Sequence, residues 1–386
     1  MNSKISETLL LVGPLPPPET GQSVSFEMLC RELKKADISI NIVNLSRSPN
    51  YIKSGFSIRR SIEMAKVLSS FFRSLTRSPQ CIYLTIAQSK SGFYRDAIMI
   101  GLAWLFKIRI IVHLKGGNYD GFYNSQGILL QCAIRSVLLK VDRILVLGES
   151  LIGMYDFEPK LKNKIRVVPN GLPVRLQSMT KSLPNITKNE PIELLFLSNL
   201  IQTKGYLHIL VALKELIHSR KVCIRCTFAG RFLSSSDDEL VLSAEEAQKH
   251  FIRSVKEYNL EQHVVYAGPV SGHDKWSLLQ KAHIFLLPTK YINEGQPVSI
   301  IEAMAHGCVT ITTNFRAISD LVIDGETGII VEYNAPFQIA NAIHHLASNH
   351  SRFAAMSIAA KDRFERLFTM KSHINRILPF LTAEDQ

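Results

Sequence analysis

Residues 284–302 read IFLLPTKYINEGQPVSIIE, and they are the most informative segment of the sequence. Its first residues form an apolar run typical of a buried parallel strand, and Pro297 suits the first position of a helix. Glu294 and Gly295 then lie on the loop before the helix, and Glu302 lies on its second turn. Because backbone N–H groups point out of a helix N-terminus at the carboxyl edge of a parallel sheet, such loops bind anions. The stretch predicts a diphosphate site.

The two glutamates suit the rest of a sugar nucleotide, because an ionised carboxylate accepts hydrogen bonds from two hydroxyls. Glutamates eight positions apart also occur on ordinary solvated helix faces. The preceding strand, the glycine and the proline favour a binding loop here, and Gly307 is expected to end the helix as its C-cap.

Short apolar runs alternate with amphipathic stretches along most of the chain, which predicts parallel sheets covered by helices. The expected strands are Thr8–Gly13, Ile38–Leu45, Cys81–Ile86, Ile108–Leu114, Arg143–Leu147, Ile192–Ser198, Cys223–Gly230, His263–Ala267, Ile284–Pro288, Val309–Thr312 and Gly328–Val331. A polar segment, residues 173–191, interrupts the series. We therefore expect two doubly wound α/β domains, residues 1–175 and 176–356, and a helical segment, 357–386, that packs back on the first domain.

The chain has 386 residues, 46% of them hydrophobic, which is enough for two cores. Its net charge of +12 lies almost wholly in residues 1–170, where 23 Lys and Arg face 12 Asp and Glu. The first half therefore favours an anionic partner, such as acceptor phosphate, an acidic membrane surface or nucleic acid. Nucleic acid is disfavoured because no recognised module or interleaved aromatic pattern is present.

Several classes of protein are disfavoured by the sequence. The first seven residues lack the pattern of a secretory signal, and Lys107 and Arg109 interrupt the most apolar stretch, so we expect a cytoplasmic protein. The six cysteines are scattered, and Cys223 and Cys226 fall in an expected strand, which favours free thiols over a redox or zinc site. We expect no metal site and no cofactor.

The segment from Glu294 to Glu302 resembles the E-x7-E signature of the retaining glycosyltransferases of family 4, within the glycosyl transferases group 1, which have the GT-B fold. Other stretches of the second half are similar to further landmarks of that family at matching spacing. They are residues 196–200 with Lys204 and Gly205, then 228–230, 266–270, 286–289 and 323–328.

The resemblance implies an enzyme whose two domains face a cleft and which transfers a sugar from a nucleotide-sugar donor to an acceptor without a metal. It implies that Glu294 contacts the donor sugar, Lys204 neutralises the leaving diphosphate and His113 faces the donor sugar. It also implies donor contacts from Ser198, Asn199, Gly230, Arg231, Val270, Gly295, Gln296, Pro297, Val298 and Glu302, the last to the ribose. Gly21, Gln22, Lys115 and Asn170 would form acceptor or cleft loops.

Three of these residues have second interpretations. His113 also fits an ordinary core histidine, and Asn170 an ordinary Asn-Gly turn. Asn199 stands where family members commonly carry an arginine, and an amide supplies no charge. Either a second cation such as Arg231 replaces that charge, or the leaving group is less stabilised.

Residues 58–75 form an amphipathic stretch in the basic half. Ile58, Ile62, Ala65 and Phe72 recur at helical spacing on one face, and Arg59, Lys66 and Arg73 on another. Such a pattern usually indicates a helix that buries its apolar face. The excess charge also allows a surface that faces anionic lipid, at the inner face of the cell membrane.

The resemblance suits assembly of a cell-surface polysaccharide, such as a lipopolysaccharide, on a glycan or lipid-linked acceptor. Two other functions remain open. An inactive sugar-nucleotide-binding subunit would share the donor loops, and an epimerase or phosphorylase on the same fold would need catalytic groups of its own.

Overall fold

The computed structural model describes residues 8–18, 20–46, 58–173, 181, 183 and 190–382; the side chains of 58–61, Arg59 among them, lie outside the description. So does most of the polar segment expected to join the domains. The chain forms two compact units, and each is described by itself. Met1–Pro173 and Phe368–Gln386 make the first unit, and Val174–Leu367 makes the second.

The first unit is built on a six-stranded parallel sheet with the order β2-β1-β3-β4-β5-β6. Its strands are β1 (Leu9–Gly13), β2 (Ile40–Asn44), β3 (Cys81–Ile86), β4 (Arg109–Leu114), β5 (Arg143–Val146) and β6 (Ile165–Val167). Every residue of β1 and β3 is buried, as expected of strands covered on both faces. The sequence predicted five of these strands and missed β6, which has only three residues.

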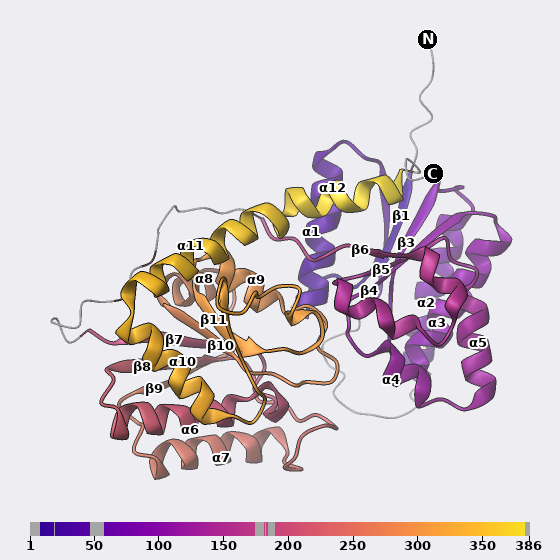
Figure 1. The fold of residues 1–386 in the computed structure, drawn as a ribbon. Helices are drawn as coiled ribbons and strands as arrows, with labels where there is room; N and C mark the ends of the chain where they lie inside the picture. The colour runs from indigo at the N-terminus through magenta and orange to yellow at the C-terminus, as the bar shows by residue number, and fades with distance from the viewer. Residues whose placement is uncertain are drawn as a thin grey trace. The chain divides into compact units, whose positions relative to one another are not determined.

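Helices cover both faces of this sheet (Figure 1). They are α1 (Gly21–Lys35), α2 (Ile58–Leu75), α3 (Lys90–Leu105), α4 (Tyr119–Asn124), α5 (Ile128–Leu138) and α12 (Met370–Leu381), with 3₁₀ turns at Glu149–Tyr155 and Pro159–Lys164. A capping box between Thr20 and Ser23 starts α1. Helices α2 and α3 pack together, and so do α3 and α5.

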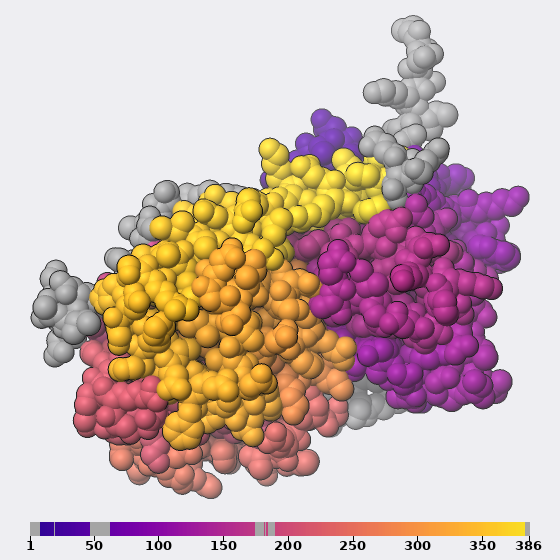
Figure 2. Space-filling model, in the orientation of Figure 1, coloured from indigo at the N-terminus to yellow at the C-terminus, as the bar shows by residue number. Residues whose placement is uncertain are grey.

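Helix α12 closes the core of the first unit, although it comes from the far end of the sequence. It packs beside α1, and Ile377 and Leu381 are fully buried against Leu9, Leu11 and Phe26. In Figure 1 the yellow α12 crosses the indigo α1, and Figure 2 shows yellow and indigo atoms next to each other. Burial of each of these two side chains contributes about 1.5–3 kcal/mol.

The second unit has its own six-stranded parallel sheet, with the order β12-β11-β10-β7-β8-β9. The strands are β7 (Ile192–Leu197), β8 (Ile224–Ala229), β9 (Val264–Gly268), β10 (Ile284–Leu287), β11 (Val309–Thr313) and β12 (Gly328–Val331). All six match strands that the sequence predicted. Cys226 is buried in β8, and Cys223 is exposed just before it.

The helices of the second unit are α6 (Tyr206–Lys214), α7 (Ala244–Glu257), α8 (Gly272–Lys281), α9 (Val298–Ala305), α10 (Pro336–Ser348) and α11 (His350–Leu367). A π-helical turn, Glu215–Ser219, extends α6, and 3₁₀ turns lie at Gln202–Lys204 and Arg316–Ile318. Helix α10 packs against α6, and α11 against α9.

The returning segment begins later than the sequence suggested. Expected from residue 357, it starts at Phe368, because all of α11 belongs to the second unit. The reason is a stripe of four buried side chains at helical spacing, which α11 packs against α9 and β11. The stripe consists of Phe353, Met356, Ala360 and Phe364.

None of the described helices is both long enough and apolar enough to cross a membrane.

Candidate active site

Two loops of the second unit meet at the carboxyl edge of its sheet. Strands β7 and β10 are neighbours, and the strand order reverses between them, because β8 and β9 extend the sheet on one side and β11 and β12 on the other. Ligands of open α/β sheets bind outside the strand ends at such a point. The loops that follow β7 and β10 carry Lys204 and Glu294.

Helix α9 begins at this edge. Pro297 is the N-cap residue, with φ −60° and ψ 111°, not the first helical residue that the sequence predicted. The reason is its extended ψ, which suits an N-cap, while its carbonyl already accepts the first helical hydrogen bond, from Ile300 N at 3.1 Å. The N–H groups of Val298 and Ser299 precede that bond and point out of the helix end.

The other end of α9 follows the expected pattern. Gly307 has a φ of 67°, and hydrogen bonds run from Gly307 N to the Met304 carbonyl and from Cys308 N to the Ala303 carbonyl, both at 2.9 Å. These are the two bonds of a Schellman motif, which stops the helix after three turns at most.

The loop after β7 that carries Lys204 (the lysine loop) makes a tight contact with the loop after β10 that carries Glu294 (the glutamate loop). The 3₁₀ turn Gln202–Lys204 ends at Gly205, whose φ is 82°. A Cβ atom at Gly205 would lie 2.4 Å from the carbonyl oxygen of Pro288, at the end of β10. Only glycine satisfies both conditions. Gly205 thereby sets Lys204 beside the loop that leads to α9.

Lys204 and Glu294 form a buried ion pair. The Lys204 Nζ atom lies 3.1 Å from Glu294 Oε2 and donates a hydrogen bond to Ser198 Oγ at 2.8 Å. The two charged side chains are only 12% and 10% exposed. Oε2 is buried, and its contact with Lys204 lacks hydrogen-bond geometry. The carboxylate therefore keeps lone pairs that can accept hydroxyl donors.

Glu302 has a cationic partner that the sequence did not reveal. Lys275, on α8, places its Nζ atom 2.6 Å from Glu302 Oε1. The two side chains are 26% and 17% exposed. The two residues are 27 positions apart in the sequence, which gives no sequence signal for this pair.

The remaining expected donor residues lie on the same edge. Gly230, with φ 151°, packs so closely on the Ser198 carbonyl that a Cβ would lie 1.9 Å from its oxygen. Asn199 and Arg231 are both exposed, and they lie near each other because Leu200 N donates to the Arg231 carbonyl at 2.8 Å. Gly295 and Gln296 are buried, whereas Val270 and Val298 are half-buried.

The first unit holds the other expected residues. His113, in β4, is fully buried, and its Nδ1 shares a hydrogen bond of 2.9 Å with the Tyr83 hydroxyl. Lys115 donates to Asn170 Oδ1 at 3.0 Å, and Ser25 Oγ donates to the same oxygen at 3.2 Å. Gly21 and Gln22 occupy the first turn of α1, one turn before Ser25.

His373, on α12, belongs to this group, although no sequence motif pointed to it. Its Nδ1–H donates to the Pro169 carbonyl at 2.6 Å, so its Nε2 is an acceptor. Nε2 of His373 and Nε2 of His113 are both buried without a hydrogen-bond partner.

Burial shifts the titration of all three basic groups. It lowers the pKa of Lys115 to about 7 and that of His373, also opposed by Lys115, to about 3. Burial, Lys115 and His373 hold the pKa of His113 well below its usual range. Both imidazoles are therefore neutral near pH 7, and His113 can offer a hydrogen bond but no charge.

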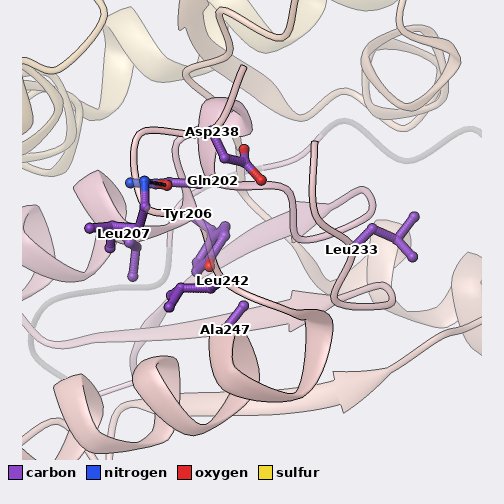
Figure 3. Close-up of a pocket in the computed structure, with 8 residues that line it drawn as sticks. Gln202, Tyr206, Leu207, Leu233, Asp238, Leu242 and Ala247 are labelled. Atoms are coloured by element: carbon purple, nitrogen blue, oxygen red, sulfur yellow. Dashed lines mark hydrogen bonds between the residues drawn. The ribbon is translucent and has the colours of Figure 1, made fainter. Parts of the chain in front are cut away.

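A small pocket of the second unit lies beside the turn Gln202–Lys204 (Figure 3). Its lining includes Gln202, Tyr206, Leu207 and Asp238. Lys204 and Glu294 do not line it. The pocket is therefore not the expected diphosphate site, although it shares the turn that carries Lys204.

The second unit is similar in sequence to known proteins. Residues 180–363 match the family model of the glycosyl transferases group 1. The capsular polysaccharide biosynthesis glycosyltransferase CapM of Staphylococcus aureus is 27% identical over 270 residues, which are 66% of this chain and 63% of that protein. Across the first curated relatives, the match spans 45% to 63% of the relative's length.

Solved structures establish the fold. The Anabaena protein HepE in complex with UDP has a TM-score of 0.70 at 12% identity, with 98% of this chain and 100% of that chain covered. The lipopolysaccharide outer core galactosyltransferase WaaB has a TM-score of 0.67 at 15% identity, with 98% and 99% covered. Residues 180–363 are therefore similar to the glycosyl transferases group 1, and the two parallel-sheet units of the chain have the GT-B fold.

Proposed function

We propose that this protein is a retaining glycosyltransferase of family 4, which moves a sugar from a nucleoside-diphosphate sugar to a glycan or lipid-linked acceptor during cell-surface polysaccharide assembly. One observation carries the proposal: the buried Lys204–Glu294 pair precedes the N-terminus of α9 where the strand order reverses. The capsular role in the name of its Staphylococcus aureus relative and the UDP bound by Anabaena HepE support the pathway and the donor class.

The chemistry begins with the leaving group. Cleavage of the bond between a sugar and a diphosphate leaves negative charge on phosphate oxygens. An ammonium can donate three hydrogen bonds, and Lys204 donates one to Ser198, so it can donate another to a phosphate oxygen. The outward N–H groups of Val298 and Ser299 stabilise the same charge. We therefore propose that transfer needs no metal.

The glutamates would hold the two ends of the donor. Glu294 accepts hydrogen bonds from hydroxyls of the sugar, because its carboxylate is buried and has unused lone pairs. Lys275 holds one carboxylate oxygen of Glu302, and we assign the other to a ribose hydroxyl. Arg231, exposed beside Asn199, would supply the cation that Asn199 lacks.

The first unit would bind the acceptor. Lys115 and Asn170 form a polar pair at the carboxyl edge of its sheet, and Gly21 and Gln22 lie at the N-terminus of α1, where an anion is favoured. We propose that His113 serves as a neutral hydrogen-bonding group towards the donor sugar.

An anionic membrane surface would recruit the protein to the inner face of the cell membrane. On α2, the apolar stripe that includes Ile62 and Phe72 is exposed, at 50% and 47%. In an ordinary amphipathic helix such a stripe would be buried. The ring of Phe72 contacts Phe106, after α3, where Leu105 is 67% exposed. Exposed Lys66 adds positive charge beside this apolar face.

Liposome flotation tests the membrane proposal. The wild-type protein should float with vesicles that contain anionic lipid, and Lys66→Glu with Arg73→Glu should lower the bound fraction. Lys249→Glu, an exposed change on α7 of the second unit, is the control. No binding by the wild type, or equal binding by all variants, would contradict the proposal.

Release of free nucleotide from a mixture of donor and acceptor tests the enzymatic proposal. A thermal-shift screen of nucleotide sugars, uridine diphosphate sugars first, should identify the donor because a ligand stabilises the folded state it binds. Glu294→Ala and Lys204→Ala should each remove most turnover. Donor binding without turnover would instead identify an inactive sugar-nucleotide-binding subunit.

A further inference from the structure

A loop between β8 and α7 carries two adjacent aspartates that bond to both site loops. Asp238 accepts hydrogen bonds from Thr203 N at 3.2 Å and from Ser235 N at 2.7 Å. Asp237 accepts one from Ile292 N at 2.9 Å and a short one from the Ser235 hydroxyl. Each carboxylate uses both of its oxygens.

The two backbone amides that the aspartates bind lie just before the proposed site residues in the sequence. Thr203 precedes Lys204, and Ile292 lies two residues before Glu294. The lysine loop and the glutamate loop also touch directly, because Lys290 N donates to the Thr203 carbonyl at 2.7 Å. The backbone of Leu240 adds a bond to Gln202 Oε1 at 2.8 Å. Figure 3 shows Asp238 near Gln202 at the pocket beside this turn.

We propose that Asp237 and Asp238 are positioning residues that fix the separation of Lys204 and Glu294 by holding one backbone amide of each loop. This inference rests on the proposed function of that pair. Neither aspartate belongs to the ion pair. Hydrogen bonds to a carboxylate are about twice as strong as neutral ones, so two half-buried aspartates can hold these two loops in place beyond the ends of their strands.

The partners of the two aspartates differ, and the difference gives a sharp test. Both partners of Asp238 are backbone N–H groups, which can only donate. An amide at this position keeps one acceptor oxygen and sets an NH₂ group against the second N–H. One partner of Asp237 is the Ser235 hydroxyl, which can rotate to accept from an amide. Asp238→Asn should therefore disrupt the loops, and Asp237→Asn should not.

Steady-state kinetics of nucleotide release read out the positioning. Asp238→Asn and Asp237→Ala should lower kcat by about 10- to 100-fold, the effect of a misplacement of about 1 Å, with a smaller change in the KM for the donor. Asp237→Asn should keep kcat close to the wild-type value. Glu239→Gln, an exposed change in the same loop that removes the same charge, is the matched control.

Chemical labelling of Lys204 provides a readout that does not depend on turnover. An amine-reactive ester should label Lys204 slowly in the wild type, where the side chain is 12% exposed, and faster in Asp238→Asn. Lys249, 68% exposed, should be labelled equally in both proteins. If the wild type shows no turnover, the proposed function fails, and the labelling still decides the role of the aspartates.

Three results would overturn the inference. They are wild-type kcat in Asp238→Asn, an equal loss in Asp238→Asn and Glu239→Gln, and unchanged labelling of Lys204 in Asp238→Asn. If Asp238→Asn does not fold, the comparison of Asp237→Ala with Asp237→Asn decides: a loss in the first and recovery in the second support positioning, and equal behaviour refutes it.

Discussion

Replacement of Lys204 by methionine should affect both stability and turnover, because it breaks a buried pair from one side. The change leaves the Glu294 carboxylate about nine-tenths buried, and its Oε2 atom already lacks a hydrogen-bond partner. Removal of one member of a buried ion pair costs about 3–5 kcal/mol. Because each side chain keeps about a tenth of its exposure, we expect about 3 kcal/mol, at the low end.

The size of the second unit converts this cost into a measurable shift. For a unit of this size, a loss of about 3 kcal/mol lowers Tm by roughly 6–12 °C. Lys204→Met with Glu294→Gln should recover at least about 2 kcal/mol, because a neutral amide needs no counter-charge. Turnover should not recover in the double variant, since the donor to the leaving group is still absent, and kcat should stay roughly 10²–10³-fold below wild type.

Differential scanning calorimetry on the single and double variants measures the stability effect. The matched control is Lys249→Met, because Lys249 forms an exposed pair with Glu245 and should shift Tm by less than about 2 °C. A Lys204→Met protein as stable as the wild type, or a double variant less stable than the single one, would refute the account of Glu294 as a carboxylate that depends on Lys204.

Three further predictions address the nucleotide, the metal and the pH. Glu302→Ala should raise the Kd for the nucleotide about 10- to 100-fold, because hydrogen bonds to a charged group are lost, and should change kcat at saturating donor much less. Calorimetric titration measures the Kd and steady-state kinetics the kcat. A fall in kcat as large as the fall in affinity would contradict a ribose contact. EDTA should leave turnover unchanged, and recovery of lost activity on addition of Mg²⁺ would contradict the proposed metal independence. In the first unit, burial lowers the pKa of His373 from 6.5 to about 3 and that of Lys115 from 10.5 to about 7, so the unfolded chain binds more protons between those values. The free energy of unfolding should therefore rise with pH between about 3 and 6.5 and again between about 7 and 10.5. Tm measured against pH should rise over the same ranges, and His373→Gln should flatten the first rise. An unchanged slope of Tm against pH in that variant would contradict the assignment of the first rise to His373.

The sequence predicted the sheets well, because a parallel strand covered on both faces must be apolar along its whole length. It missed β6, since Ile165–Val167 is too short to form a recognisable run. The start of the returning segment was misplaced because α11 and α12 are both amphipathic, and nothing in an amphipathic pattern says which core it faces.

The candidate site was predicted only as far as local motifs reach. Glu294 and Lys204 follow strands at recognisable spacing, so the sequence singled them out, although it did not predict that they pair. Lys275 and His373 lie in ordinary helices, and their partners are distant in sequence, 204 residues away for His373 and Pro169. Such contacts depend on the tertiary arrangement alone.

The position of α12 has a consequence for how the protein is made. The ribosome completes all of the second unit before it adds Ile377 and Leu381, so the first unit emerges with the apolar surface around Leu9 and Phe26 uncovered. Domains generally fold in order of synthesis, but here the unit that begins first is finished last. We expect a nascent chain stopped at Leu367 to engage chaperones through this surface, whereas residues 174–367 form the whole second unit and are the better fragment to express alone.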